Sequence, residues 1–390
     1  MRESDGEPFE VLVATWGRDH GLGWFVARAE DVYYRVLDRA PVGGTPTLST
    51  DLSAEGGFTA SPVPAGTSTT VTGRGAGTPS ATASPTTAPP SATATTVPVA
   101  AGSPTPRPAP GRQHLDPPAR LVSPVSDPLP KEGVWQPVGF PVDGMPALYM
   151  TRVRADDVHT SVLASLLWVD TSLTRALFVP GYQEPGGPNP YDGALPEKYW
   201  PDVLANWNGA FRLQDSGGGY YYGGTTVAPL RDGVATAVFY DDGRLDIGEW
   251  GRDLRMTPHV EVVRQNLQLI VDKGRSQVTN ASDSWQWGAT TDGESLAWRS
   301  AVGVRADGSL VYIGSPYLSA GGLADTLVSA GVQRAMTLDM NNWWTAGFYF
   351  SHDESGAPVC HKVDPSILEG CDRFLLRYKR DSFQILARHE

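Results

Sequence analysis

The feature that most constrains this 390-residue chain is a stretch from residue 42 to about residue 130 that is dominated by Thr, Ser, Pro, Ala and Gly. Such a segment has few large apolar side chains, so it cannot bury enough surface to offset the entropy lost on ordering. We therefore expect a disordered linker between an N-terminal segment, residues 1–41, and a folded domain, residues 131–390. The composition is typical of the stalks of surface proteins, and a plain flexible linker is the alternative.

The N-terminal segment is expected to be helical. Residues 24–37 place large apolar side chains on one broad face at helical spacing. Asp19 and His20 lie side by side just before this helix. A single His beside a carboxylate is more often a structural contact than a catalytic dyad, and we interpret the pair as structural.

The folded domain reads as a β-rich α+β fold. Several segments after residue 135 alternate or run apolar over strand lengths, and three pairs of them are separated by short turns, as in β-hairpins. The pairs are 234–240 with 245–250, 301–304 with 310–313, and 374–378 with 383–386. One segment, 323–328, has helical spacing instead and lies between strands at 310–313 and 335–340. This order predicts a parallel strand-helix-strand crossover within a mixed sheet.

The charge and the motifs of the chain exclude several classes of function. The formal net charge is -12 and no cluster of Lys and Arg is present, so we expect no nucleic-acid partner. There is no run of ~18 apolar residues that could span a membrane, and the first residues lack the basic and apolar segments of a signal peptide. No phosphate-loop or dinucleotide pattern occurs, and we expect neither a cofactor nor a metal.

The two cysteines, Cys360 and Cys371, are close in sequence and lie in a loop-like region between strands. We expect them to form a disulfide, which is stable only in an oxidising compartment. A metal site is the weaker alternative, because only His361 is nearby and the spacing matches no zinc site. Together with the stalk-like linker, the disulfide predicts an extracytoplasmic location, either secreted or attached to the cell surface.

The strongest cue for a site is Asp339, which ends the strand after the expected crossover helix. Ligands of open α/β sheets gather beyond the carboxyl ends of strands, where side chains from several connections meet. Met340, two asparagines and two tryptophans follow, so a carboxylate, amide groups and flat apolar rings come together there. Sugars are recognised by such a mixture of groups. The alternative is an Asp that caps a turn, with the tryptophans packed inward.

Two further polar clusters are weak signals by themselves. Residues 207–211 (Trp-Asn-Gly-Ala-Phe) come shortly before glycine-rich turns, where a backbone can approach a ligand closely. Arg299 opens the first strand of the second expected hairpin, where an Arg can hold a phosphate or carboxylate with two hydrogen bonds. A surface ion pair is the alternative for Arg299.

The order of these clusters resembles the phosphodiester glycosidase family, the family of the mannose 6-phosphate uncovering enzyme. The resemblance is carried by 208–211, by 299–303 leading to Asp307-Gly308, and by Leu338-Asp339 after a helix. It covers residues 207 to 344, about a third of the chain.

The chain is most similar to an actinobacterial extracytoplasmic branch of that family, through residues 250–253, 264–267 and 18–23. In that branch the last of these stretches lies just outside the membrane, after a transmembrane helix. The similarity implies that an anchoring helix precedes the present chain or that the chain starts at a downstream Met.

The resemblance implies a hydrolase that cleaves a glycosidic bond in sugar-phosphate diesters or related cell-envelope glycans. Its catalytic residues would be Asp339 as general acid or base, Arg299 on the phosphate and Asn208 orienting the substrate. Substrate-binding residues would be Gly209, Asn341, Asn342, Trp343 and Arg264, with Trp343 or Trp344 as the stacking face.

A second carboxylate is expected for glycoside hydrolysis, and Asp253 and Glu249 are the candidates that the sequence offers. One departure from the family pattern supports a competing class. The family has glycines and Ser after the Asp, whereas this chain has Met340 followed by asparagines and tryptophans. The alternative is therefore a glycan-binding or cell-wall scaffold module without catalysis.

Overall fold

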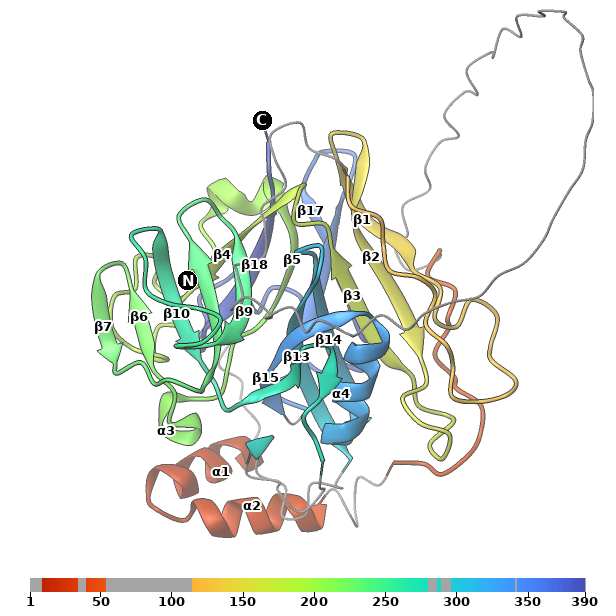
Figure 1. Cartoon of the computed structure of the whole chain (residues 1–390), viewed down its shortest axis with the longest axis horizontal. Coiled ribbons are helices and arrows are strands. Elements are labelled where there is room, and N and C mark those ends of the chain that lie inside the picture. Colours follow the sequence, from red (N-terminus) through yellow and green to blue (C-terminus); the bar gives the residue numbers. More distant parts are fainter. Residues whose placement is uncertain are drawn as a thin grey trace, which may run out of the picture.

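The structure is a computed structural model that describes residues 9–33, 40–53, 114–279, 286–288, 296–340 and 342–389. Strands form three sheets, and the described helices are few and short (Figure 1). The β-rich mixed α+β class expected from the sequence is confirmed. No described helix is both long enough and apolar enough to cross a membrane.

The largest sheet has eight strands in the order β1-β2-β3-β14-β13-β15-β11-β12. Their bounds are β1 Gln136–Val142, β2 Met145–Val153, β3 Ala164–Val169, β14 Leu310–Leu318, β13 Ala297–Arg305, β15 Val332–Met340, β11 Leu269–Asp272 and β12 Arg275–Ser276.

Two five-stranded sheets complete the β structure, in the orders β7-β6-β10-β8-β9 and β17-β16-β5-β18-β4. The first contains β7 Thr225–Ala228, β6 Tyr220–Tyr222, β10 Val260–Gln265, β8 Ala235–Tyr240 and β9 Leu245–Glu249. The second contains β17 Pro358–Lys362, β16 Gly347–His352, β5 Val203–Asn208, β18 Ser382–Ala387 and β4 Thr174–Val179. The helical elements are α1 Phe9–Asp19, α2 Gly23–Val32, the 3-10 helix η2 Glu197–Asp202, α3 Leu213–Ser216 and α4 Ala320–Ser329.

The expected crossover is the connection β14–α4–β15. Both strands pair antiparallel with β13, which lies between them, so they run parallel to each other. Ser319 caps α4 by accepting a hydrogen bond from Gly322 N at 2.9 Å, which satisfies a free N–H of the first turn. Leu323 and Leu327 are buried beneath the helix. This packing carries the chain back to the sheet and ends β15 at Asp339 and Met340.

Two of the three expected hairpins are present. β8 pairs with β9, and β13 pairs with β14, both antiparallel. The third is wrong: residues 374–378 form turns, and β18 pairs with β4 and β5 instead. Phe374 and Tyr378 are buried in a cluster with Trp343 and Trp344. The apolar pattern of this segment therefore reflects the burial of a loop and not of a strand.

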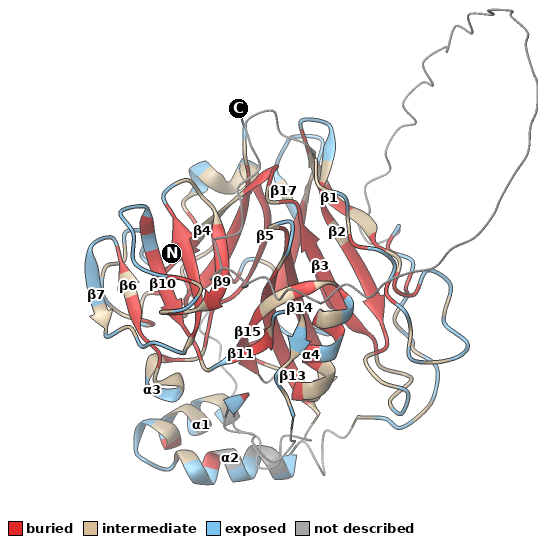
Figure 2. Ribbon diagram, in the orientation of Figure 1, coloured by how far each residue is buried: buried red, intermediate tan, exposed pale blue. Residues whose placement is uncertain are grey.

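The core lies between the sheets. Figure 2 shows most of the strands buried, whereas α1 and α2 are largely exposed. Trp207 of β5 stacks on Tyr312 of β14, with ring centroids 4.9 Å apart, and so joins two sheets. Phe178, Phe239 and Phe383 meet edge to face or tilted in the same cluster. Offset and edge-to-face ring pairs of this kind are favourable beyond the area they bury.

Both ends of the expected linker range touch the domain. Leu52 is fully buried and Thr50 Oγ1 donates to the Pro130 carbonyl. At the other end His114 Nδ1 lies 2.8 Å from Asp170 Oδ2. Residues 54–113, which make up most of the range, lie outside the described residues.

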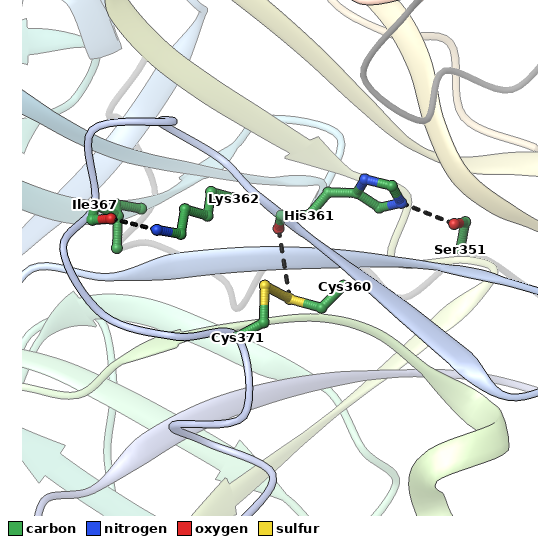
Figure 3. Close-up of a disulfide and its surroundings, with 6 residues drawn as sticks. All are labelled: Ser351, Cys360, His361, Lys362, Ile367 and Cys371. Carbon is green, nitrogen blue, oxygen red and sulfur yellow. Dashed lines mark hydrogen bonds between the residues drawn. A yellow bond between two sulfur atoms is a disulfide. The ribbon is translucent and has the colours of Figure 1, made fainter. Parts of the chain in front are cut away.

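Cys360 and Cys371 form the expected disulfide, with their Cα atoms 5.7 Å apart (Figure 3). It ties β17 to the loop that follows. Two contacts flank it: His361 Nε2 lies 2.8 Å from Ser351 Oγ, and Lys362 Nζ donates to the Ile367 carbonyl at 2.6 Å. The His361 ring is thus occupied by Ser351 rather than directed to the sulfurs.

Candidate functional site

Asp339 lies at the end of β15 and is 3% exposed. Its Oδ1 accepts from the backbone N–H of Met340 at 2.8 Å, and its Oδ2 accepts from Arg380 Nη2 at 2.8 Å. Burial raises the pKa of this carboxyl to about 6, against the opposing effects of the Arg380 charge and the Met340 N–H. A carboxyl with this pKa can take up or release a proton near neutral pH, as a general acid or base must.

Arg380 is the site residue that sequence reasoning missed. It lies in the loop before β18, and its Nη2 also donates to the Ala210 carbonyl at 3.2 Å. Its guanidinium carbon lies 4.6 Å from the centroid of the Trp344 ring, while Lys379 Nζ lies 5.1 Å from the same centroid. Residues 377–381 (Arg-Tyr-Lys-Arg-Asp) read as a charged hairpin turn, so the sequence carried no local signal for this role.

The first cluster, residues 207–211, and Asp339 are joined by a buried hydrogen-bond network. Asn208 Nδ2 donates to Ser300 Oγ at 3.0 Å, and Ser300 Oγ donates to the Asp339 carbonyl at 3.0 Å. Asn208 Oδ1 accepts from Ala346 N at 3.1 Å and from the Tyr312 hydroxyl at 3.3 Å. The amide of Asn208 is therefore used at both ends within the protein. It supports the strand that carries Asp339, and substrate orientation by Asn208 has no support in these contacts.

Gly209 allows a close approach that no other residue would permit. Its N–H donates to the Asp381 carbonyl at 2.8 Å, and a Cβ atom at this position would lie 2.4 Å from Asp381 Oδ2. Asp381 in turn accepts from Arg264 Nε at 3.0 Å, and both side chains are fully buried. Arg264 also donates to the carbonyls of Ala210 and Phe211. Gly209 and Arg264 thus fix the loop beside Asp339, and neither presents a free polar group to a ligand.

Arg299 is directed into the protein. It is 1% exposed, its Nε donates to the Leu318 carbonyl at 2.8 Å, and its Nη1 donates to the Trp287 carbonyl at 3.1 Å. Its strand position opposite Met340 brings it next to Asp339 in the sheet. The expected phosphate contact has no support in this arrangement, because an arginine already bonded to carbonyls stabilises the ends of β13 and β14.

The tryptophans after Asp339 differ in their surroundings. Arg373 donates to the Trp343 carbonyl at 2.6 Å and lies 5.3 Å from the Trp343 ring centroid, within a buried cluster. Trp344 carries Arg380 on its ring, and Arg380 is also the partner of Asp339. Asn342 is half-buried in the turn just before Trp343. Asn341 lies outside the described residues.

The carboxylates named from the sequence lie elsewhere. Glu249 and Asp253 form an ion-pair cluster with Arg252, which also binds Asp272 with Nη2 2.8 Å from Oδ1. Neither carboxylate makes a hydrogen bond or ion pair with Asp339 in the described part of the chain. Both carboxylates are instead engaged by Arg252.

The N-terminal helix α1 lies next to α3 (Figure 1). Asp19 Oδ1 accepts from Arg212 Nη1 at 2.6 Å and from Gln214 Nε2 at 2.8 Å. The Arg18 charge acts on the Asp339 carboxyl. Asp19 is thus a structural ion-pair partner of Arg212. His20 bonds the Trp16 carbonyl within the same helix region.

The described segments contain no group of three His, Cys, Asp or Glu side chains that could hold a metal ion. The site is built from one buried carboxyl, guanidinium groups and an indole. Such a set can move a proton and bind an anion.

No protein-family model and no curated protein matches the chain. Among solved structures, the catalytic domain of zebrafish N-acetylglucosamine-1-phosphodiester alpha-N-acetylglucosaminidase, auto-inhibited by its pro-peptide, is 16% identical with a TM-score of 0.40, over 70% of this chain and 87% of that chain. A hypothetical protein from Synechocystis is 10% identical with a TM-score of 0.35, over 63% of each chain. A protein from Burkholderia pseudomallei is 12% identical with a TM-score of 0.29, over 58% of this chain and 74% of that chain. Likenesses this distant assign neither a family nor an activity.

Proposed function

We propose that the domain is an extracytoplasmic hydrolase that cleaves a glycosidic bond in sugar-phosphate diesters or related cell-surface glycans. The observation that carries the proposal is the Asp339 carboxyl, which is buried at a strand end with a pKa raised by burial to about 6. Perturbed carboxyls in such positions are candidates for proton transfer. The substrate class comes from the sequence motifs around Asp339, and the disulfide supports the compartment.

In this proposal Asp339 transfers the proton and Arg380 takes the anion-binding role that the sequence assigned to Arg299. Arg380 is close to Asp339 and to Trp344, so an anionic group and a sugar ring would both find partners there. A guanidinium group can bind a phosphate through two parallel hydrogen bonds. Asn208, Ser300 and Arg264 then act as positioning residues.

The test is hydrolysis of a panel of glycosyl phosphodiesters and cell-envelope glycans by the purified chain, compared with Asp339→Asn. Loss of proton transfer should lower turnover by roughly 10²–10⁴-fold. Asp246→Asn is a matched control, because Asp246 is also buried and accepts from an arginine, Arg334 Nη2 at 3.1 Å. The control should fold and keep its turnover. Full turnover in Asp339→Asn would move proton transfer to another group.

The competing function is a glycan-binding module without catalysis, and the 3% exposure of Asp339 favours it. Both functions predict binding of glycans, and only the hydrolase predicts release of sugar. If the wild-type chain binds a glycan and releases no sugar from any substrate, the binding module is the correct function. Calorimetry of binding and detection of free sugar on the same samples separate the two.

A further inference from the structure

The loop after β4 lies along the segment that carries Arg380. Tyr182 N donates to the Tyr378 carbonyl at 3.0 Å, and Glu184 N donates to the Lys379 carbonyl at 2.9 Å. The backbone of Glu184 is thus anchored to the residue next to Arg380. This contact places an acidic residue beside the segment that carries Arg380, although the two are nearly 200 positions apart along the chain.

Two glycines hold the loops in contact. A Cβ atom on Gly181 would lie 2.2 Å from the Lys379 carbonyl oxygen, and one on Gly193 would lie 2.5 Å from the Tyr378 carbonyl oxygen. Real side chains do not reach such distances, so the two backbones approach more closely than any other residue type would allow. The position of Glu184 relative to Arg380 is therefore set by the fold rather than by a free loop.

The Glu184 side chain is half-buried, and in the described part of the chain it makes no hydrogen bond or ion pair. The charged groups that act on it come from three other segments: Arg380 and Asp381 before β18, Arg212 before α3, and Arg264 in β10. Burial raises the pKa of Glu184, opposed by these arginines and assisted by Asp381. A carboxyl that is partly removed from water and accepts no hydrogen bond is costly to ionise, so its protonated form is favoured.

We propose that Glu184 is the second carboxyl group of the site and donates a proton to the leaving-group oxygen. This inference rests on the proposed hydrolase function and adds a catalytic residue to it. Arg380 is the group that the two carboxyls share: it is hydrogen-bonded to Asp339 and its charge acts on Glu184.

The surroundings divide the roles of the two carboxyls. Asp339 accepts one hydrogen bond on each oxygen, from Arg380 and from the Met340 N–H, and both favour its ionised form. Glu184 accepts no hydrogen bond in the described part of the chain, so no donor of this kind favours its ionised form. Pairs of carboxyls in unlike surroundings commonly divide acid and base work.

A water molecule adds to the anomeric carbon while Asp339 takes its proton. The bond from that carbon to the leaving oxygen breaks, its electron pair stays on the oxygen, and Glu184 supplies a proton to that oxygen. When the leaving group is a phosphate, a neutral Glu184 also avoids repelling the anion that Arg380 and Arg212 attract. We therefore expect an anionic sugar-phosphate diester to bind best while Glu184 is protonated.

The experiment compares wild type, Glu184→Gln and Glu184→Asp on a glycosyl alkyl phosphodiester across pH. Glu184→Gln should lower kcat by about 10²-fold or more, and kcat/KM should lose its decrease at high pH, because Gln cannot deprotonate. Glu184→Asp should restore part of kcat. Glu197→Gln is the matched control, since Glu197 is an exposed glutamate in the same connection between β4 and β5.

The outcomes separate this inference from the proposed function. If wild type is active and Glu184→Gln keeps both its kcat and its decrease at high pH, Glu184 is not the acid and the hydrolase stands. If wild type releases no sugar from any substrate, the hydrolase and this inference both fall. Melting curves of each variant exclude loss of folding as the cause. Should Glu184→Gln fail to fold, a folded Glu184→Asp is the test, because its kcat should fall below that of wild type while its decrease at high pH is kept, and an unchanged kcat would count against Glu184.

Discussion

Arg380 Nη2 lies 2.8 Å from Asp339 Oδ2, although the two residues are 41 positions apart in the chain. The contact joins the end of β15 to the loop before β18, and Asp339 is almost fully buried where it forms. Two opposing effects act on the carboxyl: burial raises its pKa and the guanidinium lowers it, with burial the larger. Arg380 therefore holds the pKa of Asp339 below the value that burial alone would give.

Replacing Arg380 tests this relationship. In Arg380→Gln the charge that opposes burial is gone, so the pKa of Asp339 should rise above about 6. The increase of kcat/KM at acid pH should move to higher pH, and turnover at pH 6 should fall more than turnover at pH 8. Arg377→Gln is the control from the same loop, because Arg377 pairs with the exposed Asp192.

The pH dependence of kcat/KM for these variants is the measurement. An unchanged acid limb in Arg380→Gln, together with a normal melting curve, would show that Arg380 does not control the protonation of Asp339. A shift of equal size in Arg377→Gln would assign the effect to the net charge of the loop rather than to the contact.

The sequence identified Asp339 because its signal is local. A strand, a helix with a capping Ser319 and a second strand follow one another within about thirty residues, and the crossover ends at the carboxylate. Local patterns of this length carry hydrophobic periodicity and capping information together. The same reasoning found both hairpins whose turns contain Asp and Gly.

Arg380 and Glu184 could not be found in that way. Their positions depend on β18 pairing with β4 and β5, which are distant in sequence. The segment at 374–378 has strand-like apolar residues, and only the packing of Phe374 and Tyr378 against the tryptophans shows that it is a loop. Arg299 shows a different limit, because nothing in a strand sequence distinguishes an arginine that binds carbonyls, as Arg299 does, from one that binds a ligand.

Asp339→Asn should change how stability depends on pH. The pKa of Asp339 is about 6 in the folded chain and 3.8 in its ordinary state, so the folded chain binds more protons between these values. The contribution of Asp339 to stability is then present below pH 3.8 and is lost as the pH rises to about 6. Each pKa unit corresponds to ~1.4 kcal/mol, so relative to wild type the variant should gain up to about 3 kcal/mol over this range.

Urea unfolding of both proteins at several pH values measures this difference. Asp51→Asn is an informative control, because Lys131 and Ser53 lower the pKa of the exposed Asp51 to about 2. Its difference from wild type should have the opposite sign and be small, since exposed pairs are screened. A difference between Asp339→Asn and wild type that does not change with pH would mean that Asp339 has an ordinary pKa.

Removal of the disulfide should lower stability without changing the site. Cys360 and Cys371 are 11 positions apart and close a short loop beyond β17, so the loss should be on the order of 2–3 kcal/mol. Cys360→Ser with Cys371→Ser should therefore unfold at lower urea concentration and keep its turnover per folded molecule. Mass spectrometry of the unreduced wild type should find no free thiol, and two free thiols would contradict the bridge.

Gly209→Ala should damage the loop that supports Asp339. The added methyl would meet Asp381 Oδ2 at 2.4 Å and the Asp381 carbonyl at 2.8 Å, and both atoms are held, one by Arg264 and one by the Gly209 N–H. Overpacking of a buried site costs about 1–3 kcal/mol. Turnover should fall as well, because the next residue, Ala210, accepts a hydrogen bond from Arg380 and would be displaced with the overpacked alanine.

Gly23→Ala is the control, since a Cβ there would meet no atom within 4 Å. Thermal melting and turnover of the two variants give the answer: a Gly209→Ala protein as stable and active as Gly23→Ala would show that the 208–211 loop can move away from Asp381 at little cost.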